Sequence, residues 1–235
     1  MMPSSNVTVS PDRDGRAEWD IAICEFVERT LYTAVVSDSL DQLGIRHQAM
    51  SEYLRPVHKG CKFAGWARTI SCSDVYHVVD DPYAMEIEAV DSLLPGEAAV
   101  IGTQKSKRNA PWGELLSTAA KVRGARGAIV DGLIRDIGKI EELGFPVFAA
   151  GIKPVDSMGR GLVTAYNVPV ECGDVLVHPG DLIFADFDGV VVIPGTRVRE
   201  VVELAADKVQ REDGTRAELL AGGYLRDVFR KYGVL

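Results

Sequence analysis

The sequence is poor in cysteine, and its few cysteines are not spaced for a metal site or a disulfide framework. Four occur, Cys24, Cys61, Cys72 and Cys172, and no two of them form a Cys-x-x-Cys pair. No histidine stands at zinc-finger spacing from them. We therefore expect reduced, mostly buried thiols in a cytoplasmic protein.

Long apolar runs and basic runs are also lacking. No apolar run approaches the roughly 18 residues that a membrane span needs, and residues 1–20 do not read as a secretory signal. The formal net charge is -8, without a Lys/Arg-rich run that would mark a nucleic-acid face. We expect no nucleic-acid or membrane partner, although a small basic pocket for an anionic metabolite stays compatible with an acidic whole.

The overall composition, with 46% hydrophobic and 26% charged residues, is typical of a globular protein. Patterning divides the chain into a loose polar arm over 1–16, a core domain over 17–212, and a C-terminal helix and tail over 213–235. Helix and strand patterns alternate through the middle of the chain, and a β-rich stretch with turn signals follows over 161–194. The fold class is therefore α/β, in one domain.

The segment that opens with Gly113-Glu114-Leu115-Leu116 predicts the start of a helix. The first N–H groups of a helix lack intrahelical partners, and together with the helix dipole they favour an anionic ligand. Gly113 lets a ligand approach the backbone closely. A substrate carboxylate could bind there without a lysine.

The same segment closes with Arg135-Asp136, just after a predicted strand that begins at Ala128. The planar fork of Arg135 suits a carboxylate or a 2-oxo acid. Asp136 is a hard oxygen ligand of the kind that holds Mg²⁺ together with several waters, and Glu114 could accept hydrogen bonds from those waters. Such a set would stabilise a pyruvate enolate after C–C cleavage. The alternatives are a surface ion pair, and an Asp136 that caps the next helix.

These residues resemble a known family. Glu114, twenty intervening residues and then Arg135-Asp136 match the signature of the class II 4-hydroxy-4-methyl-2-oxoglutarate/4-carboxy-4-hydroxy-2-oxoadipate aldolases, which belong to the RraA-like family. "WGELLSTAAKVRGARGAIVDGLIRD", "GDLIFADFDGVVVIP" and "VVSDSLDQLG" resemble its characteristic blocks. The resemblance covers roughly residues 18–212.

The resemblance implies a layered β/β/α fold of the swivelling-domain type, a homotrimer or a hexamer of two trimers with sites near the subunit interfaces, and dependence on Mg²⁺ or Mn²⁺. It implies that Gly113, Glu114, Leu115 and Leu116 bind the pyruvyl end through backbone amides. Further roles fall to Arg135, which would bind the 2-oxo acid and support proton transfer, to Asp136 as the metal ligand, and to Glu114, which would hold its waters. Glu212 is the candidate for a carboxylate that a neighbouring subunit contributes, with a solvated helix residue as the alternative.

Two segments depart from the family pattern. In "GIKPVDSMGRG", Lys153 or Arg160 could recognise a distal carboxylate, or the loop could simply be solvated and basic. In "SCSDVYHVVDDPYAME", His77 could face the site or be structural. These departures bear on the substrate more than on the core chemistry.

The function that we expect is a metal-dependent lyase that cleaves a small 2-oxo di- or tricarboxylic acid and releases pyruvate, with oxaloacetate decarboxylation as a side activity. Two rival hypotheses remain. One is a non-catalytic, RraA-type protein-binding regulator of an RNA-degrading endonuclease. The other is a related metal-enolate enzyme that acts on a sugar-derived acid.

Overall fold

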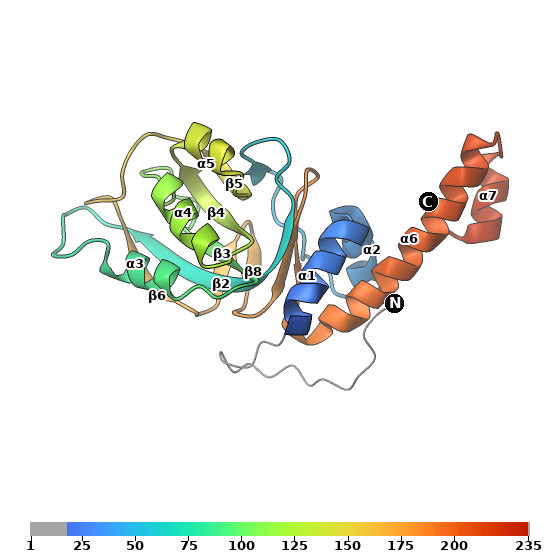
Figure 1. The fold of residues 1–235 in the computed structure, drawn as a ribbon, viewed down its shortest axis with the longest axis horizontal. Helices are drawn as coiled ribbons and strands as arrows, with labels where there is room; N and C mark the ends of the chain where they lie inside the picture. Colours follow the sequence, from blue (N-terminus) through green and yellow to red (C-terminus); the bar gives the residue numbers. More distant parts are fainter. Residues whose placement is uncertain (1–17, 235) are drawn as a thin grey trace.

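A computed structural model describes residues 18–234, and a curved mixed sheet forms its centre (Figure 1). The strand order is β1-β5-β4-β3-β2-β9-β10, with β6 paired to the far part of β2. The strands are β1 Arg55–Pro56, β2 Phe63–Asp74, β3 Glu97–Gly102, β4 Gly127–Ile134, β5 Val147–Ile152, β6 Gly161–Tyr166, β7 Val170–Cys172, β8 Val175–Val177, β9 Leu182–Ala185 and β10 Val190–Ile193. The helices are α1 Glu18–Thr30, α2 Thr33–Gln42, α3 Ala84–Asp91, α4 Glu114–Val122, α5 Ile137–Leu143, α6 Val198–Leu220 and α7 Leu225–Tyr232, with a short 3-10 turn at Gly195–Arg197.

Strands β2, β3, β4 and β5 run parallel, and α3, α4 and α5 connect them in turn along one face of the sheet. Each of these helices packs an apolar side against that face, where Trp112, Ile134, Ile140 and Phe145 are buried. Because the strands are parallel, their carboxyl ends share one edge of the sheet, and the β3–α4 and β4–α5 connections meet there.

The opposite face of the sheet is closed by strands rather than helices. The β7–β8 ribbon and residues around Met50 and Leu54 pack on it, and Phe63 meets Phe148 edge to face with ring centroids 6.1 Å apart. The layers are thus β, β and α, as the family resemblance implies.

Strand β4 is longer than its pattern predicts, because it continues through an irregularity after Val130 to Ile134. Asp131 is buried there and accepts a hydrogen bond from the Tyr53 hydroxyl at 2.6 Å. Gly132 has no room for a side chain, since a Cβ would lie 2.6 Å from Thr103 Oγ1. This extension carries the chain to the sheet edge before Arg135.

The helices α1, α2 and α6 pack around the β2, β9 and β10 end of the sheet, on the far side from α4 and α5 (Figure 1). Strands β9 and β10 form a hairpin whose turn contains Asp188-Gly189. Its Asp186 also accepts hydrogen bonds from the Thr33 N–H at 2.8 Å and the Thr33 hydroxyl at 2.6 Å, which fastens the start of α2 to the hairpin.

The C-terminal region differs from its prediction. Helix α6 runs without a break to Leu220, so the expected boundary between 212 and 213 falls inside it. Gly214 does not end the helix; a Cβ there would lie 2.8 Å from Tyr232 Cε1, so glycine admits the tyrosine ring of α7. The arm predicted over 1–16 lies outside the described residues. All four cysteines are buried thiols outside any disulfide, as expected. No helix within residues 18–234 has the length and apolarity to cross a membrane.

Candidate active site at the edge of the parallel strands

Two loops that follow neighbouring strands carry the residues singled out by the sequence. Trp112 bridges to Ile134, and the Arg135 N–H donates to the Trp112 carbonyl at 3.0 Å. This pairing sets the start of α4 directly beside the start of α5. Gly113-Glu114 and Arg135-Asp136, which twenty intervening residues separate in the sequence, are therefore brought together.

Asp136 occupies the N-cap position of α5 but does not cap that helix with its side chain. Its backbone is left-handed, with φ 63°, a conformation that costs free energy in a non-glycine residue. This backbone turns the carboxylate toward the neighbouring helix, where its Oδ2 lies 3.4 Å from the Glu114 backbone N. The sequence left open whether Asp136 is a metal ligand or the cap of α5, and its side chain does not cap α5.

Gly113 is needed for this approach. A Cβ at Gly113 would lie 2.7 Å from Asp136 Oδ2 and 3.1 Å from Arg135 Cγ. Contacts under 3.0 Å with a Cβ essentially do not occur, so a side chain here would push the two loops apart. The glycine permits the carboxylate to face the α4 N-terminus.

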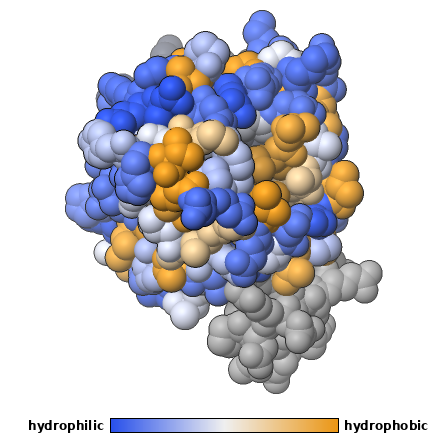
Figure 2. Space-filling view, turned by 90° about the vertical axis from the view of Figure 1, so that its left-hand side faces the viewer, coloured by the Kyte–Doolittle hydropathy of each residue, from blue (hydrophilic) through white to orange (hydrophobic). Residues whose placement is uncertain are grey.

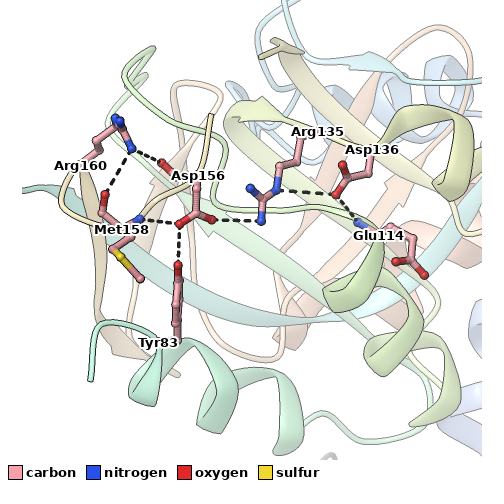
Figure 3. A network of polar contacts seen from close by, with 7 residues as sticks. All are labelled: Tyr83, Glu114, Arg135, Asp136, Asp156, Met158 and Arg160. Carbon is pink, nitrogen blue, oxygen red and sulfur yellow. Dashed lines mark hydrogen bonds and ion pairs between the residues drawn. The ribbon is translucent and has the colours of Figure 1, made fainter. Parts of the chain in front are cut away.

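The Arg135 guanidinium is shared between two carboxylates (Figure 3). Its Nε lies 3.6 Å from Asp136 Oδ2, and a terminal nitrogen lies 3.0 Å from Asp156 Oδ1. Arg135 keeps 38% of its side chain exposed, which leaves part of the fork open to a ligand. The arginine is thus oriented by the protein without being enclosed by it.

Asp156 joins Arg135 to helix α3. Its Oδ2 accepts hydrogen bonds from the Tyr83 hydroxyl at 2.5 Å and from the Met158 N–H at 3.0 Å. Burial raises the pKa of Asp156, but these hydrogen bonds and the charge of Arg135 outweigh it, and the net pKa lies below its ordinary value. The same contact, with burial, raises the pKa of Tyr83 to about 12. Asp156 is therefore ionised at neutral pH and holds Arg135 by charge.

Sequence reasoning missed Asp156 and Tyr83. It considered the loop that holds Asp156, but for its cations, and those bond to backbone: Lys153 Nζ donates to the Lys107 carbonyl at 2.8 Å, and Arg160 to the carbonyls of Asp156 and Met158 at 3.3 Å. His77 is exposed. Whether any of these three contacts a substrate stays a prediction.

The Glu114 carboxyl has a different orientation from Asp136. Its Oε1 accepts a hydrogen bond from the Thr118 hydroxyl at 2.9 Å, one turn further along α4, and it points away from the Asp136 carboxyl (Figure 3). Leu115 is 77% exposed beside it, whereas Leu116 packs against the core. The first turn of α4, with its backbone N–H groups, thus lies at an exposed end of the helix.

Glu212 is not brought to this site within one chain. It lies on α6, at the opposite end of the molecule from α4 and α5 (Figure 1), in a hollow that Tyr32 and Asp38 also line. Lys208 Nζ lies 3.9 Å from the Glu212 carboxyl. Burial raises the pKa of Glu212 above its ordinary value. A role for Glu212 in a neighbouring subunit's site stays a prediction.

The oxygen ligands around Asp136 suit a metal site with a single protein carboxylate. Within residues 18–234, no three His, Cys, Asp or Glu side chains are grouped to enclose an ion. Asp136 instead offers a single carboxylate, 45% exposed, beside a helix N-terminus. Mg²⁺ and Mn²⁺ are often held by one or two carboxylates, waters and substrate oxygens, and this arrangement suits them.

Comparison with known proteins places this architecture among relatives. The model of the RraA-like family (Aldolase/RraA) matches residues 33–192. A putative 4-hydroxy-4-methyl-2-oxoglutarate aldolase of Halalkalibacterium halodurans is 33% identical over 82% of this chain and 86% of that protein. An uncharacterized protein of Pseudomonas syringae has a similar structure, with a TM-score of 0.81 and 26% identity over 97% of this chain and 100% of that one. Streptomyces coelicolor RraAS2, an unusual member of the RNase ES inhibitor RraA family, matches with a TM-score of 0.74 and 31% identity over 83% and 96%.

Proposed function

The chain belongs to the RraA-like family, and from this membership and the geometry at Arg135 we propose that it is a divalent-metal-dependent lyase. It cleaves a C–C bond of a small 2-oxo acid and releases pyruvate. The observation that carries the proposal is the meeting of three features at one sheet edge: the open N-terminus of α4, the half-exposed fork of Arg135, and the Asp136 carboxylate held toward them by a left-handed backbone.

The positive groups of the site bind the anionic substrate, and its carboxylates bind the metal ion and its waters. The backbone amides from Gly113 to Leu116 bind the substrate carboxylate at the positive end of α4. Arg135 binds the 2-oxo oxygen and neutralises the negative charge that moves onto it as the C3–C4 bond breaks. Asp136 would hold Mg²⁺ or Mn²⁺, and Glu114 would accept hydrogen bonds from the surrounding waters. When bound, the ion supplies Lewis-acid polarisation of the 2-oxo group.

The reaction yields two products. The 4-hydroxyl loses its proton to water, and its oxygen forms a double bond to C4 as the C3–C4 bond breaks, which releases the C4 fragment as a carbonyl compound. The electron pair of the broken bond passes to C3, and C3 takes a proton from water to give pyruvate. Substrates of the 4-hydroxy-4-methyl-2-oxoglutarate type, which appear in the name of the Halalkalibacterium halodurans relative, are the reference. Oxaloacetate decarboxylation follows the same enolate chemistry and is the proposed side activity.

A coupled assay tests the core of the proposal. Pyruvate formed from oxaloacetate is followed with lactate dehydrogenase, for protein treated with EDTA and for the same protein with Mg²⁺ or Mn²⁺ restored. We expect turnover that depends on added metal. If no 2-oxo acid is turned over with either ion, the lyase assignment is wrong.

A protein-binding regulator is the second candidate, because the chain also resembles RraAS2 in structure. A docking surface, however, does not require a left-handed Asp136 or a glycine that admits its carboxylate. The pyruvate assay distinguishes the two candidates, because a regulator would show no metal-dependent pyruvate release. A regulator would instead alter the rate of a ribonuclease, which a separate assay measures.

The active enzyme is proposed to be a homotrimer or a hexamer, in which Glu212 of one copy reaches the site of another. Activity should then be lost when the protein is diluted to verified monomers. Full activity in monomers would remove Glu212 from the reaction.

A further inference from the structure

Asp156 uses its two carboxylate oxygens for different partners. Oδ1 lies 3.0 Å from a terminal nitrogen of Arg135. Oδ2 accepts hydrogen bonds from the Tyr83 hydroxyl at 2.5 Å and the Met158 N–H at 3.0 Å, and Figure 3 shows these two donors approaching from other directions than Arg135. A carboxylate oxygen has two lone pairs, so the two donors fill Oδ2. Asp156 can therefore offer Arg135 only one oxygen.

The buried pair of Arg68 and Glu97 shows what happens when an oxygen has room for a second donor. Glu97 Oε2 accepts the Leu94 N–H at 2.9 Å and also bonds Arg68 Nε at 3.1 Å, while Oε1 bonds a terminal nitrogen of Arg68 at 2.9 Å. This is the bidentate pairing that an arginine and a carboxylate favour. With only a backbone donor on Oδ2, Asp156 would be equipped for the same pairing.

Helix α3 holds Tyr83 in its position. Tyr83 is the N-cap residue of α3, and its carbonyl accepts the Ile87 N–H at 2.9 Å. Ala89 and Val90, further along the helix, are buried in the core beneath it. Figure 2 looks onto the end of the molecule at which Figure 1 places α3, and it shows hydrophilic residues between the apolar patches. The Tyr83 hydroxyl thus reaches Asp156 from a surface helix that other residues anchor.

The Tyr83 hydroxyl remains a hydrogen-bond donor at physiological pH. Its hydrogen bond to Asp156, then burial and the negative charge of Asp156, raise the pKa of Tyr83 to about 12. A general acid works best when its pKa lies near the pH of the reaction, so this phenol is poorly suited to protonate a substrate. Its contribution is the hydrogen bond to Asp156.

We propose that Tyr83 is a positioning residue, which keeps the Arg135 guanidinium open to substrate by occupying the second oxygen of Asp156. Without the Tyr83 hydroxyl, Asp156 would bond two nitrogens of Arg135, and a substrate would first have to displace it. The proposal rests on the proposed lyase function and adds to it a residue that touches neither the substrate nor the metal.

This role predicts an effect on substrate binding rather than on the chemical step. When the binding-competent form is only partly populated, the apparent dissociation constant rises by the inverse of its populated fraction. Once substrate has displaced Asp156, Arg135 is as open in a Tyr83 variant as in the wild type, so kcat should not change. A general loss of structure around α3 would lower kcat and the melting temperature as well.

The first test is steady-state kinetics on oxaloacetate, with the full chain and Mg²⁺. Tyr83→Phe removes one oxygen atom from a half-buried side chain. KM should rise by roughly tenfold, the usual contribution of one hydrogen bond to a charged group, while kcat and the melting temperature stay close to those of the wild type. The matched control is Tyr166→Phe, whose hydroxyl donates to Glu88 of the same helix at 2.7 Å and whose KM should equal that of the wild type. An unchanged KM in Tyr83→Phe overturns the proposal.

A double-mutant cycle separates this role from direct contact with substrate. Asparagine at position 156 has one oxygen and an N–H₂ group, so it cannot bond the guanidinium with two oxygens. Tyr83→Phe should therefore leave KM unchanged when it is added to Asp156→Asn. If the same rise in KM persists in that background, Tyr83 acts on the substrate or on the fold, and the proposal is wrong.

A measurement without turnover separates failure of this proposal from failure of the lyase assignment. Butane-2,3-dione modifies accessible guanidinium groups, and peptide mass spectrometry gives the rate for each arginine. Arg135 should react several times more slowly in Tyr83→Phe than in the wild type, because a bidentate pair occupies more of its N–H groups. Arg230, 73% exposed, should react equally in both proteins, and the buried Arg68 in neither. Slower reaction of Arg135 without any turnover retains the role of Tyr83 and rejects the lyase; an equal or faster reaction rejects the role of Tyr83, whatever the turnover.

Discussion

Two arginines of this molecule pair with carboxylates in opposite ways. Arg68 and Glu97 are 2% and 1% exposed, and the guanidinium bonds both carboxylate oxygens, at 3.1 and 2.9 Å. Glu97 also accepts the Leu94 N–H at 2.9 Å. Arg135, in contrast, divides its fork between Asp136 and Asp156 and keeps 38% of its side chain exposed.

The difference separates a buried arginine–carboxylate pair from an exposed one, and we propose that the first serves stability and the second binds substrate. A closed bidentate pair inside the protein leaves its acid no oxygen for a ligand, and breaking it leaves a buried charge alone. The Arg135 guanidinium is held by Asp136 and Asp156, and its partly exposed N–H groups can still donate hydrogen bonds to solvent or a ligand. The following predictions test whether the two pairs differ in this way.

The largest effect should come from Asp136→Ala. This change removes the carboxylate that faces the α4 N-terminus, and kcat should fall by at least about a thousandfold, which corresponds to about 4 kcal/mol. Thermal unfolding should stay close to that of the wild type, since Asp136 is exposed and strained. Near-normal turnover would mean that the metal is held elsewhere.

Glu97→Ala should act on stability instead. Removing one partner of a buried pair costs about 3–5 kcal/mol of unfolding free energy, measured by urea denaturation. The control is Glu142→Ala, whose exposed pair with Lys139 spans 2.8 Å and should contribute about 0.5 kcal/mol or less. If the two variants are equally stable, the buried pair is not the structural one.

Arg135→Lys should reduce kcat/KM by roughly a hundredfold, because a point charge cannot reproduce a planar fork. Its unfolding free energy should change little. A mild kinetic effect together with a large loss of stability would reverse the comparison and make Arg135 the structural arginine.

Asp156→Asn should have a smaller effect, roughly five- to tenfold on kcat/KM, because Arg135 loses one of the two charges that orient it. Asp227→Asn, on an exposed pair with Arg230 in α7, serves as the control. A higher rate in Asp156→Asn would show instead that Asp156 competes with substrate for the arginine.

The smallest effect concerns pH. Burial on α3 and then the negative charge of Asp156 raise the pKa of Glu86 to about 7 in the folded protein, from an ordinary value of 4.5 when unfolded, so the folded state binds the proton more tightly. Its contribution to stability is therefore complete below pH 4.5 and is lost as the pH rises through 7. Glu86→Gln should gain about 1 kcal/mol over the wild type between pH 5 and pH 8. A constant difference in urea denaturation would mean that Glu86 is not shifted.

The sequence predicted the parts of the site that are local or follow a strand. The spacing of Glu114 and Arg135-Asp136 was recognised from its resemblance to a family signature. The structure brings these residues together because parallel strands place the ends of successive βα units at one edge. The fold class followed from the alternation of helix and strand patterns, and the structure and its relatives confirm it.

The remainder depended on contacts between distant segments. Tyr83 and Asp156 stand 73 residues apart and have no pattern in common. Asp186 lies in the β9–β10 turn, and its hydrogen bonds to Thr33 span 153 residues. The role of an acid in a loop depends on the donors that the fold brings to it, and this is why Asp156 was missed.

The contact of Gly113 with Asp136 and Arg135 has a consequence for reshaping this protein. Position 113 accepts one amino acid, whereas Leu115, two residues further along, is 77% exposed and has room for other side chains. A mutant library aimed at new substrates should therefore keep position 113 fixed and diversify position 115. Two neighbouring positions of one helix start thus differ in how much change the fold tolerates.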